Sequence, residues 1–195
     1  MSANEKRYVL LDRDGVINRR MPSGYVRSWD PFEFLPRALE ALRLLALQGY
    51  TAQVVSNQAC VAEGLLSPRD LDAITHRFLR EVALSGGNIA QVYYCRHRAA
   101  DQCHRRKPRP GLLRRALAEH RFAPEATFFV GDCPGDLRAA DDLGCSMILI
   151  RRTAFLEIRR AHEESPIVAC NLYEAAELIL ASQYTQPREA AMAMH

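Results

Sequence analysis

The stretch Tyr8-Val9-Leu10-Leu11-Asp12-Arg13-Asp14-Gly15 ends a short apolar run on two carboxylates that stand one residue apart. Side chains two residues apart in a strand point to the same face, so Asp12 and Asp14 can approach one point beyond the strand end. Two carboxylates at one point repel each other unless a cation or a proton lies between them. The pattern is therefore either a solvated loop with two acids or a catalytic pair, with Asp12 as nucleophile and Asp14 as general acid and base.

The bulk composition is that of one globular domain: 195 residues, 48% hydrophobic, 25% charged, with a net charge of +3. We expect this domain to span residues 1–183 and the polar, Ala-rich residues 184–195 to form a flexible tail. The apolar stretch after the charged N-terminus is too short for a signal peptide or a spanning helix, which predicts a cytoplasmic protein without a membrane partner. We also expect a monomer. The six cysteines favour thiols or metal ligands over a disulfide framework.

Apolar runs alternate with helical spacing along the chain. Strands are predicted over Tyr8–Leu11, Thr51–Val55, Ile89–Tyr94, Thr127–Val130, Ser146–Ile150 and Ile167–Ala169. Helices are predicted from Leu35 to Ala46, from a Ser67 cap to Gly86, from Leu112 to His120, over about 135–143, and from an Asn171 and Glu174 capping box. This order predicts an α/β fold, in which a doubly wound, mainly parallel sheet lies between two helix layers as a three-layer sandwich.

Polar residues gather where the predicted strands end: Asp12, Asp14, Ser56, Asn57 and Asp132, with Lys107 in the loop after the third strand. Ligands of such sheets bind beyond the carboxyl ends of the strands. Mg²⁺ prefers oxygen ligands, which Asp12, Asp132 and the Asp14 backbone carbonyl can supply. Lys107, Ser56 and backbone amides would bind phosphoryl oxygens. This set predicts hydrolysis through an aspartyl phosphate on Asp12, with Asp14 protonating the leaving alkoxide and then activating water.

Four segments, Asp12-Arg13-Asp14-Gly15, Ser56-Asn57-Gln58, Lys107-Pro108 and Gly131-Asp132, resemble the motifs of the haloacid dehalogenase (HAD) phosphatases in order and spacing. More narrowly, the chain resembles the branch of heptose 1,7-bisphosphate 7-phosphatases and histidinol phosphatases. That likeness rests on Asp12-Arg13-Asp14-Gly15-Val16-Ile17-Asn18, Gly24-Tyr25-Val26, Phe32-Glu33-Phe34, Tyr94-Cys95-Arg96-His97 and Arg106-Lys107-Pro108-Arg109-Pro110-Gly111.

The resemblance implies a Mg²⁺-dependent phosphatase without a large cap domain, which agrees with the short segments after the first two strands. It implies phosphate or substrate contacts for Asn18, Ser56, Asn57, Gln58, Arg106 and Lys107, with Arg106 meeting the distal part of the substrate. It also implies that Asp136 supports the ion or Lys107 from behind. The expected substrate is the 7-phosphate of D-glycero-D-manno-heptose 1,7-bisphosphate, and histidinol phosphate or another small ester is the alternative.

The branch also carries a zinc loop with the pattern Cys-x-His followed by Cys-x-Cys before Arg-Lys-Pro. Here Cys95, His97 and Cys103 match, but Arg105 occupies the place of the fourth ligand. Structural zinc normally takes four nitrogen or sulfur ligands. Two alternatives follow: His104 completes a zinc site, or the site is lost and the two thiols lie near enough to oxidise.

Basic residues crowd the same loop: Arg96, Arg98, Arg105, Arg106, Lys107 and Arg109, with Arg114 and Arg115 beyond it. Arginine forks suit phosphate, and the stretch lacks the interleaved aromatics of a nucleic-acid stacking platform. We therefore expect a small phosphorylated metabolite rather than nucleic acid.

Functions of other classes are a phospho-acceptor signalling domain and an inactive binding homologue. Asp14 argues against the first, since a switch gains nothing from fast hydrolysis. The four filled motifs argue against the second. A dehalogenase would not need an acid at position 14.

Overall fold

The computed structural model describes residues 7–22, 24–150 and 167–182. The predicted tail over 184–195, and the domain boundary before it, lie outside these residues. In the part described, six strands form one parallel sheet in the order β3-β2-β1-β4-β5-β6. The strands are β1 Arg7–Leu11, β2 Tyr50–Asn57, β3 Ile89–Cys95, β4 Phe128–Gly131, β5 Ser146–Ile150 and β6 Ile167–Ala169.

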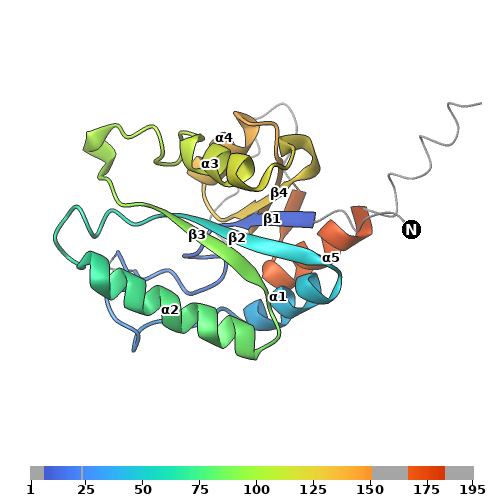
Figure 1. The fold of residues 1–195 in the computed structure, drawn as a ribbon, viewed down its shortest axis with the longest axis horizontal. Helices are drawn as coiled ribbons and strands as arrows, with labels where there is room; N and C mark the ends of the chain where they lie inside the picture. The colour runs from blue at the N-terminus through green and yellow to red at the C-terminus, as the bar shows by residue number, and fades with distance from the viewer. Residues whose placement is uncertain (1–6, 23, 151–166, 183–195) are drawn as a thin grey trace, which may run out of the picture.

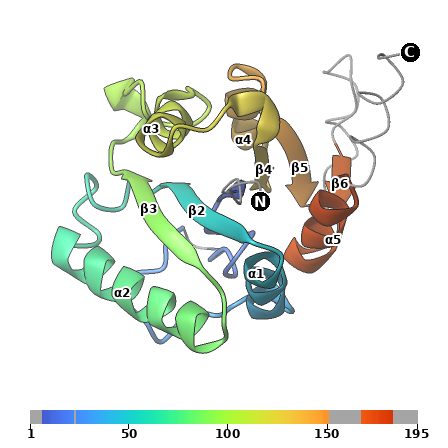
Figure 2. The ribbon, with the colours of Figure 1, turned by 45° about the vertical axis from the view of Figure 1, so that its right-hand side comes forward.

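The helices are α1 Ala38–Leu47, α2 Pro68–Leu84, α3 Gly111–His120, α4 Pro134–Asp141 and α5 Leu172–Ser182, with short 3-10 turns at Ala99–Asp101 and Pro124–Ala126. They cover both faces of the sheet: α1, α2 and α5 lie on one side and α3 and α4 on the other (Figures 1 and 2). The predicted three-layer α/β sandwich is confirmed. Among the described helices, none has both the length and the apolar character that crossing a membrane requires.

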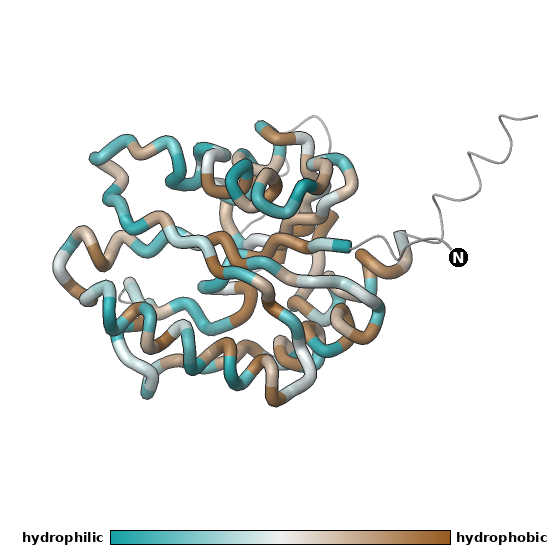
Figure 3. Tube along the Cα trace, in the orientation of Figure 1, coloured by the Kyte–Doolittle hydropathy of each residue, from teal (hydrophilic) through white to brown (hydrophobic). Residues whose placement is uncertain are grey.

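The two hydrophobic cores follow from strand alternation. Val9 and Leu11 of β1 join the core beneath α1, α2 and α5, whereas Leu10 between them joins the core beneath α3 and α4. All three are fully buried, because a central parallel strand is covered on both faces. Figure 3 shows hydrophobic residues gathered in the central strands and a mostly hydrophilic loop between β3 and α3.

The helix starts confirm most of the predicted capping. Ser67 Oγ accepts a hydrogen bond from the Asp70 amide at 3.1 Å, directly before Pro68. Asn171 Oδ1 accepts from the amides of the first turn of α5, but the Glu174 carboxylate accepts from the Cys170 amide instead of closing a full capping box. Helix α1 begins three residues later than predicted, because Arg37 has a left-handed backbone with φ of 62°.

The functional edge arises where the strand order reverses. The chain leaves β1 toward β2 and β3, and then returns to pair β4 with the other side of β1. The loops after β1 and β4 therefore diverge, and ligands of such sheets bind beyond the carboxyl ends of the strands at this switch point. Leu11 is paired with both Val54 and Val130, and the Asp12 amide donates to the Val130 carbonyl at 2.9 Å. The first catalytic candidate thus lies at the switch point.

Two leucines of α2 provide a test of the packing. Leu71 is fully buried, whereas Leu84 on the same helix is 71% exposed. Leu71→Ala should lower the free energy of unfolding by about 2–5 kcal/mol, because it removes buried contacts and leaves a cavity. Leu84→Ala should change it by no more than about 0.5 kcal/mol. Urea denaturation of both variants measures the difference, and equal losses would contradict the arrangement of α2.

Candidate active site

Three buried charged side chains form the centre of the site: Asp12, Lys107 and Asp136, each at most 5% exposed. Lys107 Nζ lies 3.0 Å from Asp12 Oδ1 and 2.6 Å from Asp136 Oδ1, and it donates to the Val55 carbonyl at 2.9 Å. Asp12 Oδ1 also accepts from the Arg13 amide at 2.7 Å. The ammonium therefore joins groups from three strand ends, as the common placement of the motifs predicted.

Burial and neighbouring charges shift the pKa values of Asp12 and Lys107 away from their ordinary values. Burial raises the pKa of Asp12 to about 7, although Lys107 lowers it, and the neighbouring carboxylates Asp136, Asp132 and Asp14 raise it further. Burial would lower the pKa of Lys107, but the charges of Asp12 and Asp136 outweigh burial and raise it. Excess negative charge around Asp12 is the condition under which a further cation binds.

Asp14 is held by a set of donors that fix its orientation. Arg13 Nη2 lies 3.0 Å from both carboxylate oxygens, Asn18 Nδ2 donates to Oδ1 at 2.8 Å, and Gln58 Nε2 donates to Oδ2 at 2.6 Å. Burial alone would raise the pKa of Asp14, but the Arg13 charge and the amide hydrogen bonds outweigh burial and lower it. The resting protein therefore favours the carboxylate form of Asp14.

The structure places Asn18 and Gln58 on Asp14, whereas the resemblance implied contacts with the substrate. Both residues are fully buried. Gln58 Nε2 also lies 3.2 Å from Ser56 Oγ, so one amide connects the end of β2 to the Asp14 carboxylate. These contacts give the two amides a positioning function.

Asn57 positions the backbone of the lysine loop. Its Nδ2 donates to the Lys107 carbonyl at 2.9 Å, and its Oδ1 accepts from the Lys107 amide at 3.2 Å. Arg106 Nη1 donates to the His97 carbonyl at 3.1 Å, which leaves its predicted contact with the distal part of a substrate as a prediction.

Asp132 completes the set of predicted metal ligands. Its carboxylate is almost buried, and the ideal position of a Gly15 Cβ would lie 1.9 Å from Asp132 Oδ2, so only glycine leaves room for it. Arg20 Nη2 donates to Asp132 Oδ1 at 2.6 Å and to the Asp14 carbonyl at 3.2 Å. One cationic nitrogen thus reaches both oxygens, which shows that they converge on one point. Together with Asp12, this donor set fits a hard divalent cation.

Asp136 lies behind this set, as the resemblance implied. Its Oδ2 accepts from the Asp132 amide at 3.1 Å and from the Cys133 amide at 3.2 Å. Asp136 therefore holds both the Asp132 backbone and the Lys107 ammonium.

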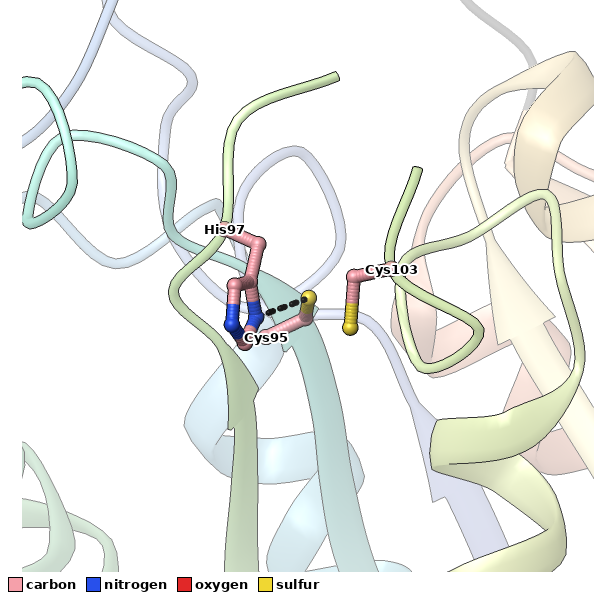
Figure 4. Close-up of side chains that lie close together, drawn as sticks. All are labelled: Cys95, His97 and Cys103. Atoms are coloured by element: carbon pink, nitrogen blue, oxygen red, sulfur yellow. Dashed lines mark hydrogen bonds between the residues drawn. The ribbon is translucent and has the colours of Figure 1, made fainter. Parts of the chain in front are cut away.

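Three of the four candidate zinc ligands lie together. The ligand atoms of Cys95, His97 and Cys103 are all within 4.8 Å of one another, and Cys95 Sγ lies 3.7 Å from His97 Nδ1 (Figure 4). Burial and the nearby Cys103 raise the pKa of the Cys95 thiol, so its thiolate requires a cation beside it. Cys95, at the end of β3, and Cys103, four residues before Lys107, are both free thiols. Spacing and donor type fit zinc.

His104 does not belong to this group of ligand atoms in the described residues, so its place as the fourth ligand stays one of two predicted alternatives. The His104 carbonyl accepts from the Gly111 amide at 3.1 Å, and the His104 ring carbon Cδ2 lies 2.9 Å from the ideal position of a Gly111 Cβ. This turn directs the side chain toward the start of α3. The described residues therefore supply three protein ligands.

Two arginines of the site were not identified from the sequence. Arg13 is fully buried, with its guanidinium 5.6 Å from the centre of the Tyr94 ring and its Nη1 3.4 Å from the Tyr94 hydroxyl. That hydroxyl also lies 2.9 Å from Thr75 Oγ1 of α2. In the sequence, only the position of Arg13 between Asp12 and Asp14 indicated that it could pair with a carboxylate. Nothing in the sequence links Arg20 to Asp132.

Comparison with known proteins places this arrangement in a class. Residues 104–175 match the family model described as HAD-hydrolase-like. A crystal structure of D,D-heptose 1,7-bisphosphate phosphatase from B. bronchiseptica, complexed with magnesium and phosphate, matches with a TM-score of 0.84 and 30% identity, over 90% of this chain and 99% of that one. The fold and the carboxylate and lysine cluster are those of a HAD-like hydrolase.

Sequence relatives narrow the class. The D-glycero-beta-D-manno-heptose-1,7-bisphosphate 7-phosphatase of Pseudomonas putida is 37% identical over 144 residues, which cover 73% of this chain and 81% of the relative. The D-glycero-alpha-D-manno-heptose-1,7-bisphosphate 7-phosphatase of Mycobacterium tuberculosis is 38% identical over 139 residues, covering 71% and 73%. The chain belongs to the family of D-glycero-D-manno-heptose-1,7-bisphosphate 7-phosphatases.

The contact between Gly15 and Asp132 yields a stability prediction. Gly15 has φ of +99° and no space for a Cβ, whereas Gly64 has φ of +71° and nothing within 4 Å of the ideal Cβ position. Gly64→Ala should cost only the backbone strain, about 1–2 kcal/mol. Gly15→Ala should cost at least about 1 kcal/mol more, because the Asp132 carboxylate must also move. Chemical denaturation of both variants tests this, and equal losses would contradict the close approach.

Proposed function

We propose that this chain is a phosphatase that releases the 7-phosphate of a D-glycero-D-manno-heptose 1,7-bisphosphate. The observation that carries the proposal is the buried Asp12, paired with Lys107 and surrounded by further carboxylates at the strand switch point. Membership of the family supports the choice of substrate. The relatives include enzymes named for the beta and for the alpha anomer, so both anomers belong in the test.

In the proposed mechanism the Asp12 carboxylate attacks phosphorus, and the bond from phosphorus to the O7 leaving oxygen breaks as Asp14 donates a proton to that oxygen. Water then attacks phosphorus and gives a proton to Asp14, while the bond between phosphorus and Asp12 breaks. Inorganic phosphate leaves, with Asp12 again a carboxylate and Asp14 again protonated. Lys107 and Ser56 would bind the phosphoryl oxygens, since Lys107 contacts Asp12 and Ser56 lies near the end of the neighbouring strand β2.

Asp14 needs different protonation states in the two halves of this mechanism. The Arg13 charge and the amides of Asn18 and Gln58 favour its carboxylate, which suits the second half, where it accepts a proton from water. A phosphate dianion entering beside Asp14 raises its pKa, because like charges disfavour ionisation. Asp14 would then take up a proton from solvent or from a substrate monoanion, and so become the acid of the first half.

Mg²⁺ would be held by Asp12, the Asp14 carbonyl and Asp132, and when bound it would supply the positive charge that lets a dianionic phosphate approach two carboxylates. The bridging contact of Arg20 supports this assignment, because one cation already satisfies two of those oxygens. Lys107 would stay paired with Asp12 and Asp136.

We further propose that Cys95, His97 and Cys103 hold a zinc ion with its fourth position outside these protein ligands. Such an ion would join the end of β3 to the segment four residues before Lys107, and so support the lysine loop. The single domain over residues 1–183, the monomeric state and the cytoplasmic location stay predictions from the sequence.

The activity prediction uses purified protein and both heptose bisphosphate anomers. Asp12→Asn should lower phosphate release by at least about a thousandfold, because the nucleophile is lost, and chelation of divalent cations should abolish release in the unmodified enzyme. Asp30→Asn, an exposed acid in the first loop, serves as the matched control and should retain activity.

Substrate choice is decided in the same assay. Faster release from histidinol phosphate than from either bisphosphate would replace the proposed substrate. Formation of a lasting phosphoprotein without release would favour a phospho-acceptor. Failure on every ester would favour an inactive homologue.

The zinc prediction needs no substrate. Elemental analysis of the full chain should give about one zinc per molecule, and Cys103→Ala should lose it, because two ligands hold zinc poorly. Cys170→Ala changes an exposed thiol and should retain the zinc. A content near zero in the unmodified chain would contradict the proposed site.

A further inference from the structure

Arg20 lies in the place that the proposed function gives to a metal ion. Its Nη2 donates to Asp132 Oδ1 at 2.6 Å and to the Asp14 carbonyl at 3.2 Å, which are two of the three oxygen donors assigned to Mg²⁺. Its neighbour in sequence points elsewhere: Arg19 Nη2 pairs with Glu33 at 2.7 Å, and both of these side chains are more than half exposed.

Asp132 pairs with Arg20 at the edge of the buried cluster. It is 3% exposed, and its partner Arg20 is 43% exposed, so the pair lies at the boundary between the buried cluster and solvent. An ionised carboxylate buried without a cation is costly, and Asp12 adds negative charge nearby. In the absence of metal, the Arg20 guanidinium places a positive charge against this buried carboxylate.

Arg20 and a metal ion cannot use the same oxygens together. Mg²⁺ binds its ligands at about 2.1 Å, closer than any hydrogen-bond donor, and its charge repels a guanidinium at the same atoms. Asp132 has little freedom to turn another oxygen toward the ion, because its Oδ2 lies in the space left by the missing Gly15 side chain. Binding of the ion therefore requires Arg20 to leave.

We propose that Arg20 is an internal competitor for the metal site: it bridges Asp132 and the Asp14 carbonyl in the metal-free enzyme, and Mg²⁺ binds only by displacing it. This inference rests on the proposed function, since it uses the same donor set. The partly exposed guanidinium has solvent to move into, because Arg20 approaches the site from its surface side. The affinity for Mg²⁺ is then lower than the oxygen donors alone would give.

The test measures Mg²⁺ binding to the full chain by isothermal titration calorimetry, without substrate. Arg20→Met keeps the length of the side chain and removes its charge, and should tighten Mg²⁺ binding roughly tenfold or more, the equivalent of one charge-assisted hydrogen bond. Arg19→Met is the matched control and should bind Mg²⁺ like the unmodified chain. In the metal-free state, Arg20→Met should unfold at a lower temperature, and Mg²⁺ should raise that temperature by more than in the control.

Arg20→Gln is the second variant, in case the methionine variant does not fold without metal. It keeps a donor for Asp132 but carries no charge, and it should bind Mg²⁺ more tightly than the unmodified chain. Unchanged or weaker binding by the folded Arg20 variants would overturn the inference and leave the proposed function intact. Failure of all variants and of the unmodified chain to bind Mg²⁺ would overturn both.

Discussion

The ammonium of Lys107 is the constraint on which the site depends. Asp12 and Asp136 are both buried, and two such carboxylates can share one region only if a positive charge lies between them. That charge comes from a loop after β3, whereas the carboxylates follow β1 and β4. The pairing therefore ties together segments far apart in the sequence. Even so, burial keeps the pKa of Asp12 raised, and the carboxylates Asp136, Asp132 and Asp14 raise it further, so one ammonium does not offset both effects. Either a divalent cation or the Arg20 guanidinium can balance part of the negative charge of these carboxylates.

The topology explains why these charges meet. Placing β1 between β2 and β4 brings three strand ends to one edge, and the loops after β1 and β4 open away from each other. Every strand pair described is parallel, so every carboxyl end faces the same way. The sheet alone therefore brings the charged residues of the site together. The two hydrophobic cores hold the strands in place, and the strand ends in turn position Asp12 and Asp132.

The strands and the main site residues could be predicted because they depend on local patterns. Apolar runs set the strands, and parallel order places Asp12, Ser56 and Asp132 on one edge. Features that depend on tertiary contacts could not. Arg13 is buried because Tyr94 and Asp14 surround it, and no periodicity signals that environment. His104 turns away from the thiols because its carbonyl accepts from the Gly111 amide, a matter of backbone direction. Arg20 reaches a carboxylate 112 residues away.

The side chain of Asn57 helps to set the direction of Lys107. A carboxamide presents one donor and one acceptor in a plane, as a peptide group does, and Asn57 uses both on the backbone of Lys107. It therefore acts as one more peptide unit at the end of β2, and the lysine loop continues the pairing pattern of the sheet without being a strand. The direction of Lys107 is set by the rigid ladder of β2 instead of by the irregular loop that carries it. A loop rich in charged residues can thus change at its outer surface while the Lys107 ammonium keeps its direction.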